Sequence, residues 1–121
     1  MLFTKLIPNV FYIDIQEGID LFVNCLDFKI SYNDLQSAAP CCVVEKDNLA
    51  FFLHENEEYA LKDRPEFRLH TPDINAVYTK VKASHPQYLH PNLNKPTLRP
   101  WGATEFALKD ATNVCIIIQQ W

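Results

Sequence analysis

The order of apolar patterns along the chain limits its fold most, because one succession of elements occurs twice. Apolar residues recur at helical spacing in two stretches, which are Ile15, Ile19, Phe22 and Leu26, then Ile74, Val77, Tyr78 and Val81. Each stretch follows a short apolar strand, at about 5–11 or 66–70, and precedes three strand-like runs. These runs span about 28–33, 40–46 and 48–55, then 88–99 (irregularly), 103–109 and 114–120. The pattern strand-helix-strand-strand-strand, written twice, predicts an α+β protein.

Local signals support these boundaries. Asp14 and Asp73 stand where helix N-caps are expected, and Lys46-Asp47-Asn48 predicts a hairpin turn. We therefore expect one domain over residues 1–121, with a module at about 1–55, a polar linker at 56–65 and a module at about 66–121. A ferredoxin-like fold is the main alternative, but it would leave residues 99–120 with one strand too many.

Composition narrows the class of protein. The 121 residues are 48% hydrophobic and 21% charged, with a net charge of −4 and no Lys/Arg cluster, which argues against nucleic-acid binding. No apolar run reaches the roughly 18 residues of a membrane span, and no signal-peptide pattern is evident. The four cysteines match no zinc motif. We expect a cytoplasmic protein with reduced thiols and no membrane partner.

Strand alternation separates an apolar face from a mixed one on several strands. The apolar face is expected to pack on the helices, and the mixed face to line the concave side of the sheet. A small-molecule site on the mixed face would combine apolar surface with convergent polar groups. The candidate ligand-binding residues are Phe52, His54, Glu66, Arg68, His70, Trp101, Glu105, Ile117 and Gln119. The alternative is that this face is simply hydrated.

Individual candidates allow two interpretations. Arg68 either binds the carboxylate or phosphate of a ligand, or forms an ion pair with Glu66 or Glu105. His54 and His70 are candidate general bases or hydrogen-bonded structural groups. Trp101 either stacks on a ligand or closes the rim of the site. The chain has only two glycines and no nucleophile-base spacing, so we assign no phosphate loop and no catalytic residue.

Residues 99–118 carry a more specific pattern, with Pro100-Trp101-Gly102, then Glu105-Phe106, then Lys109-Asp110 and a turn. This resembles the C-terminal signature of the glyoxalase / bleomycin-resistance / extradiol-dioxygenase superfamily, the vicinal oxygen chelate proteins. The resemblance implies two βαβββ modules forming a curved mixed sheet around a cleft, with helices on the convex side. Asn113 stands where the signature has glycine, and asparagine tolerates the left-handed backbone of that turn.

The resemblance also permits a test for metal ligands. Metal-dependent members place His, Gln or Glu on the first, fourth, fifth and eighth strands, which here correspond to Ile7, Phe52, Glu66 and Ile117. Three of these side chains cannot bind a metal. The resemblance therefore points to a metal-free, cofactor-free protein of the bleomycin-resistance type, a homodimer that sequesters a small molecule in a concave cleft and confers antibiotic resistance.

Two other functions are compatible with the sequence. One is an enzyme, a lyase, isomerase or dioxygenase, with an atypical metal site built from His54, Glu66, His70 and Glu105. The other is a degenerate relative that acts only in protein interaction. A binding protein without catalysis is the function that the sequence favours.

Overall fold

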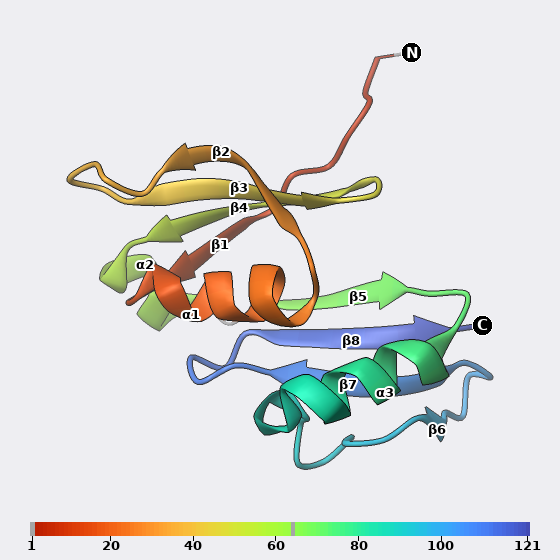
Figure 1. The fold of residues 1–121 in the computed structure, drawn as a ribbon. Helices are drawn as coiled ribbons and strands as arrows, with labels where there is room; N and C mark the ends of the chain where they lie inside the picture. The colour runs from red at the N-terminus through yellow and green to blue at the C-terminus, as the bar shows by residue number, and fades with distance from the viewer. Residues whose placement is uncertain (1, 64) are drawn as a thin grey trace. The chain divides into compact units, whose positions relative to one another are not determined.

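The computed structural model describes residues 2–63 and 65–121, and it divides the chain into two compact units, residues 1–63 and 64–121. The first unit contains β1 (Asn9–Tyr12), α1 (Ile15–Ile19), a π-helical segment (Asp20–Cys25), β2 (Lys29–Asp34), β3 (Cys41–Lys46), β4 (Leu49–Glu55) and α2 (Glu57–Lys62). The second contains β5 (Glu66–His70), α3 (Ile74–Ser84), a 3₁₀ turn (Pro86–Tyr88), β6 (Thr97–Leu98), β7 (Thr104–Lys109) and β8 (Cys115–Gln120) (Figure 1).

Each unit holds one four-stranded mixed sheet, and the two sheets repeat the same topology. The strand orders are β1-β4-β3-β2 and β5-β8-β7-β6. In both, the first strand pairs in parallel with the last strand of its unit, and the other neighbours are antiparallel. The α+β class and the two βαβββ modules predicted from the sequence are thus confirmed.

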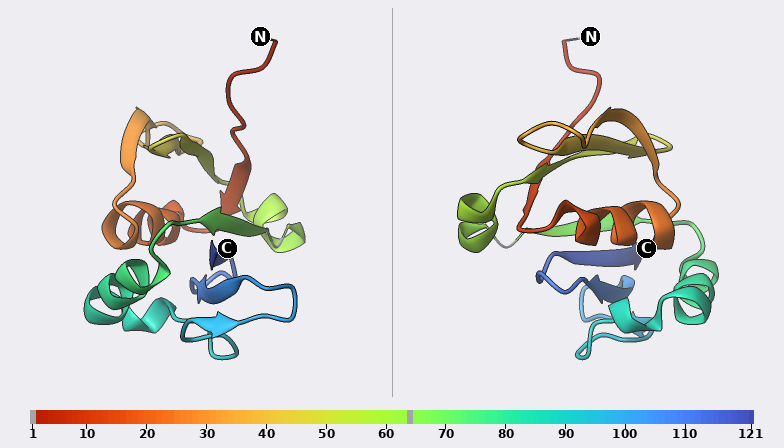
Figure 2. Two further views of the ribbon diagram at one scale, coloured as in Figure 1. Left: turned by 90° about the vertical axis from the view of Figure 1, so that its right-hand side faces the viewer. Right: turned by 60° about the vertical axis from the view of Figure 1, so that its left-hand side comes forward.

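In the first unit, α1 and the π-helical segment cover one face of the sheet (Figure 2). Asp14 caps α1, because its carboxylate accepts a hydrogen bond from the Gln16 amide at 3.0 Å. The buried ring of Phe22 packs on Phe51 of β4, with their centroids 4.8 Å apart. This face of the sheet is therefore the core of the unit.

In the second unit, α3 covers one face of β7 and β8. Asp73 caps the helix by accepting a hydrogen bond from the Ala76 amide at 3.1 Å, as its position in the sequence predicts. Tyr78 meets Phe106 edge to face, and Ile74 and Val81 are buried. The opposite face of this sheet carries the residues predicted for a site.

Three segments differ from the sequence prediction. The first strand begins at Asn9 rather than near residue 5, since Pro8 has no amide to donate to a ladder. The predicted linker contains α2, which Asn56 caps through the Tyr59 amide. Of the strand predicted at 88–99, only β6 is formed, because the segment before β6 contains Pro91 and Pro96. That segment contacts β7 through isolated hydrogen bonds, such as the one from the His90 amide to the Ala107 carbonyl at 2.9 Å.

All four cysteines are free thiols. Cys25 and Cys42 are buried, whereas Cys41 on β3 and Cys115 on β8 are half-buried. Burial raises the pKa of the Cys41 and Cys115 thiols, with further contributions from Asp34 and Glu66 respectively. None of the described helices is long and apolar enough to cross a membrane.

Candidate functional site

The register of the second sheet brings most of its predicted residues onto one face. Arg68 of β5 lies opposite Ile117 of β8, and His70 lies opposite Gln119. Glu105 of β7 lies opposite Gln119 from the other side. Because residues two apart on a strand share a face, these side chains form two adjacent cross-strand rows. The helix α3 packs on the other face, where Tyr78 meets Phe106.

Glu105 is the centre of this face. Its side chain is only 1% exposed, yet it is a carboxylate. Its Oε2 accepts hydrogen bonds from Gln119 Nε2 at 2.7 Å, Trp101 Nε1 at 3.1 Å and Arg68 Nε at 3.4 Å. Buried charges persist in proteins when they are paired and hydrogen-bonded, and all three donors meet that need.

These donors also set the ionisation of Glu105. Burial by itself would raise the pKa of this carboxyl. The hydrogen bonds from Gln119 and Trp101 and the charge of Arg68 outweigh burial, so the pKa of Glu105 lies below its ordinary value. The group is a permanent anion at neutral pH.

A tight turn carries Arg99 and Trp101 to the same carboxylate. The Gly102 amide donates to the Arg99 carbonyl at 2.9 Å, and the Arg99 amide donates to the Ala103 carbonyl at 2.8 Å. Gly102 has φ +97°, a conformation that glycine adopts without strain. The Arg99 guanidinium lies over the Trp101 ring, 5.0 Å from its centroid, and its Nε is 3.9 Å from Glu105 Oε1.

The face of the first sheet opposite Phe51 and α1 carries stacked rings. His54 stacks on Phe52 with centroids 4.2 Å apart and on Phe11 at 5.4 Å. Tyr59 of α2 extends the row beyond Phe11, at 5.1 Å. The His54 Nε2 lies 3.1 Å from Asn9 Oδ1. Burial lowers the pKa of His54, which favours the neutral imidazole.

The predicted residues thus fall into separate clusters. Arg68, Trp101 and Gln119 each donate a hydrogen bond to Glu105, and Phe52 and His54 stack on each other in the first unit. Ile117 is buried beside Arg68, while Glu66 and His70 are exposed and flank Arg68 along β5.

Sequence reasoning missed Arg99 and Phe11. Arg99 was missed because it reaches Glu105 from a turn, where alternation gives no direction. Phe11 lies on the same face as Phe52 and His54 through the parallel β1–β4 register. Extending the alternation argument to the first strand would have found it.

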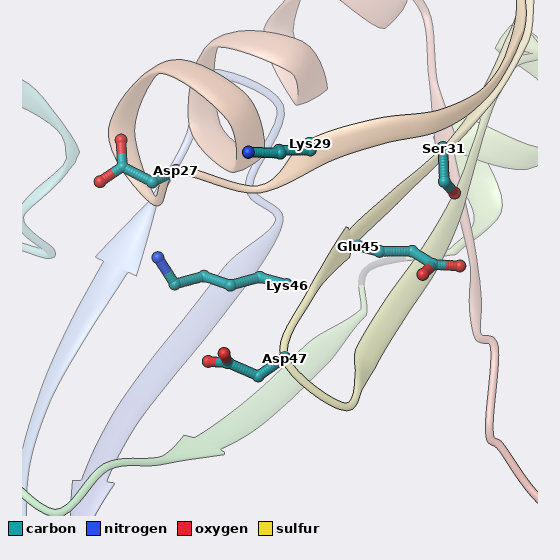
Figure 3. Close-up of a pocket in the computed structure, with 6 residues that line it drawn as sticks. All are labelled: Asp27, Lys29, Ser31, Glu45, Lys46 and Asp47. Atoms are coloured by element: carbon teal, nitrogen blue, oxygen red, sulfur yellow. The ribbon is translucent and has the colours of Figure 1, made fainter.

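A pocket of about 440 Å³ lies elsewhere, at the end of the first sheet near the β3–β4 turn (Figure 3). Its lining is mostly charged and comprises Asp27, Lys29, Ser31, Glu45, Lys46 and Asp47. None of these was predicted as a site residue. The pocket carries both signs of charge, and Glu45 at its border already pairs with Lys5 at 3.1 Å.

The described residues do not fit the metal site that the superfamily resemblance implies. Within residues 2–63 and 65–121, no three His, Cys, Asp or Glu side chains are grouped so that they could hold an ion. At the expected ligand positions, Phe52 is stacked on His54 and Ile117 is 7% exposed beside Arg68. Ile7 precedes β1.

Comparison with solved structures identifies the fold. It is the fold of solved bleomycin-binding proteins, so the architecture that the resemblance implied is confirmed. A bleomycin-binding protein complexed with bleomycin has a TM-score of 0.75 and 21% identity, covering 97% of this chain and 98% of that one.

Two further structures agree. The bleomycin-binding protein of the bleomycin-producing Streptomyces verticillus, complexed with copper(II)-bleomycin, has a TM-score of 0.74 and 15% identity over 98% and 96% of the two chains. A bleomycin resistance determinant encoded on transposon Tn5 has a TM-score of 0.75 and 22% identity over 96% of each chain. No family model and no curated protein sequence matches the chain.

Proposed function

We propose that the protein is a metal-free small-molecule-binding protein of the bleomycin-resistance type, which sequesters a ligand and performs no chemistry on it. The observation that carries this proposal is the Glu105 cluster. It combines a buried carboxylate of lowered pKa with two arginines and a half-exposed tryptophan on the sheet face opposite α3. Convergent polar groups beside apolar surface are typical of ligand sites.

The first sheet supports the same proposal. Phe52, His54 and Phe11 form a half-buried row of rings on the sheet face opposite Phe51 and α1, and Tyr59 of α2 contacts the Phe11 end of the row. Rings in such a row offer flat apolar surface to a planar ligand group. Because the fold is similar to that of proteins crystallised with bleomycin, bleomycin is the first ligand to test. Antibiotic resistance is the corresponding biological role.

Thermal melting with bleomycin, a cationic glycopeptide, and with small aromatic acids tests this function. A ligand that binds only the folded protein raises the melting temperature by mass action. The Phe52→Ala and Arg68→Ala variants should each reduce the shift. If no compound of either class shifts melting, sequestration is refuted.

Metal analysis of the purified protein tests the metal-free part of the proposal. We expect substoichiometric zinc, iron, nickel and manganese, and ligand binding that survives EDTA. One equivalent of a metal that is lost with the His54→Ala or Glu105→Ala variant would instead indicate the lyase, isomerase or dioxygenase alternative.

We also propose a homodimer. Leu2, Phe3 and Leu6 in the segment before β1 are each at least 80% exposed, and a second chain would cover them. Light scattering of the intact chain should give twice the mass of 14.0 kDa, and deletion of residues 1–6 should shift the protein toward monomer.

A further inference from the structure

The charges around Glu105 do not balance. Two guanidinium groups, those of Arg68 and Arg99, lie within 4 Å of a single carboxylate. Along β5, Glu66 is two residues from Arg68 on the same face, but no contact joins them among the described residues. The contacts of the cluster therefore leave one positive charge without a partner.

Most of the donor groups of Arg68 are unused. Only its Nε donates to Glu105, at 3.4 Å. In the part of the chain that the structure describes, its two terminal nitrogens donate to nothing, and its side chain is 48% exposed. These nitrogens form a planar fork whose geometry matches a carboxylate.

Arg99 is also incompletely satisfied. Its Nε is buried and has no hydrogen-bond partner among the described residues, because Glu105 Oε1 at 3.9 Å is too distant. Its guanidinium is held in place by stacking over Trp101. A fixed guanidinium with free donors binds an incoming acceptor with little loss of side-chain entropy.

Glu105 and Trp101 explain why both arginines stay in this position. Glu105 holds them on one carboxylate, and the low pKa of its carboxyl keeps it charged across the neutral range. Trp101 uses its N–H on Glu105 and leaves its ring 46% exposed, which gives apolar surface next to the positive groups.

We propose that this cluster is an anion-binding subsite, in which Arg68 and Arg99 receive the carboxylate of a small molecule whose apolar or aromatic body lies against Trp101. The proposal rests on the ligand-binding function above and deepens it by giving the charge of the ligand. It predicts a preference for an organic acid over bleomycin, whose charge is positive. Glu105 acts as a positioning residue.

Calorimetry with 2-naphthoate and its neutral isostere 2-naphthamide, each at millimolar concentration, tests the proposal on the full-length protein. We expect the acid to bind about tenfold tighter or more, as charge-assisted pairing implies. Arg68→Gln and Arg99→Gln should each remove most of this preference, while Arg68→Lys, which keeps the charge but not the fork, should retain part of it. Lys109→Gln removes a positive charge from the same face away from Glu105 and is the matched control; it should leave the preference unchanged.

Trp121→Phe makes Trp101 the only tryptophan, so quenching of its emission reports binding at the subsite. Melting curves of each variant show that it is folded. The inference is overturned if the amide binds as well as the acid, if Lys109→Gln removes the preference as Arg68→Gln does, or if only bleomycin binds. In each of these cases ligand binding itself stands. If acid, amide and bleomycin all fail to bind, the proposed function falls together with the inference.

Discussion

Gln119 donates its side-chain amide to Glu105 at 2.7 Å across the β7–β8 pair, and the two residues are direct partners in the ladder. This contact joins two candidates that the sequence could place only on a common face. It also fixes the amide of Gln119, with its nitrogen toward Glu105.

The first prediction concerns the stability that Glu105 provides. Glu105→Gln removes the charge that three donors share, and we expect a loss of about 1.5–3 kcal/mol in the free energy of unfolding, measured in urea. Glu66→Gln is the matched control, because Glu66 is exposed on the same face; its effect should stay within about 0.5 kcal/mol. Equal effects of the two variants would contradict the central role of Glu105.

The second prediction is acid sensitivity caused by Glu105. Its pKa in the folded protein is below the ordinary value of about 4.5, so the unfolded chain takes up the proton first as the pH falls. Stability from this group is therefore complete above pH 4.5 and is lost as the pH falls through the lower folded value. Unfolding curves at a series of acidic pH values should show the free energy of unfolding of the wild type approaching that of Glu105→Gln as the pH falls. Parallel curves would refute the assignment.

The third prediction concerns His54 at milder pH. Burial lowers the pKa of His54 below its ordinary 6.5, so the unfolded state again binds the proton first. The free energy of unfolding should fall as the pH drops through 6.5, and His54→Phe should remove that part of the slope. Proton NMR of the His54 ring gives the pKa directly; a value above 6.5 would reverse the sign.

The fourth prediction follows from the contact between Gly18 and Tyr12. A Cβ at position 18 would lie 2.8 Å from Tyr12 Cζ, and the Tyr12 side chain is fully buried. Gly18→Ala should therefore destabilise the protein by about 1–3 kcal/mol, despite the helix propensity of alanine. In a Tyr12→Leu background the same substitution should cost less, and chemical denaturation of the four proteins gives the coupling.

The fifth prediction tests the turn of the C-terminal signature. Asn113 has φ 68°, where glycine is free of strain and alanine is not. Asn113→Gly should leave the melting temperature unchanged or raise it, whereas Asn113→Ala should cost about 1 kcal/mol. If alanine is tolerated as well as glycine, the left-handed conformation is not what selects asparagine here.

Local signals in the sequence accounted for most of the fold. The caps Asp14 and Asp73 sit beside the helices that they start, so their effect is readable within a few residues. The π-helical segment Asp20–Cys25 was not predicted, because apolar spacing of three and four residues looks the same for an α-helix. The linker helix α2 was missed because its sequence is polar.

The candidate site was harder to predict. Alternation correctly placed Arg68, Glu105 and Gln119 on one face. The face that a side chain occupies can be read from the sequence of its own strand. Glu105 can be buried as a carboxylate because it accepts hydrogen bonds from β5, β8 and the turn at 99–103. These three segments lie far apart in sequence. No pattern within one strand carries that information, and Arg99 was missed for the same reason.

The half-buried thiols Cys41 and Cys115 give the two candidate sheet faces separate chemical reporters. Cys41 lies opposite His54 in the first sheet, and Cys115 lies opposite Glu66 in the second. Because both pKa values are raised, both thiols should alkylate slowly enough for their rates to be compared by mass spectrometry of peptides. A ligand that slows only Cys115 leaves its footprint beside Arg68, and one that slows only Cys41 leaves it among the rings of the first sheet.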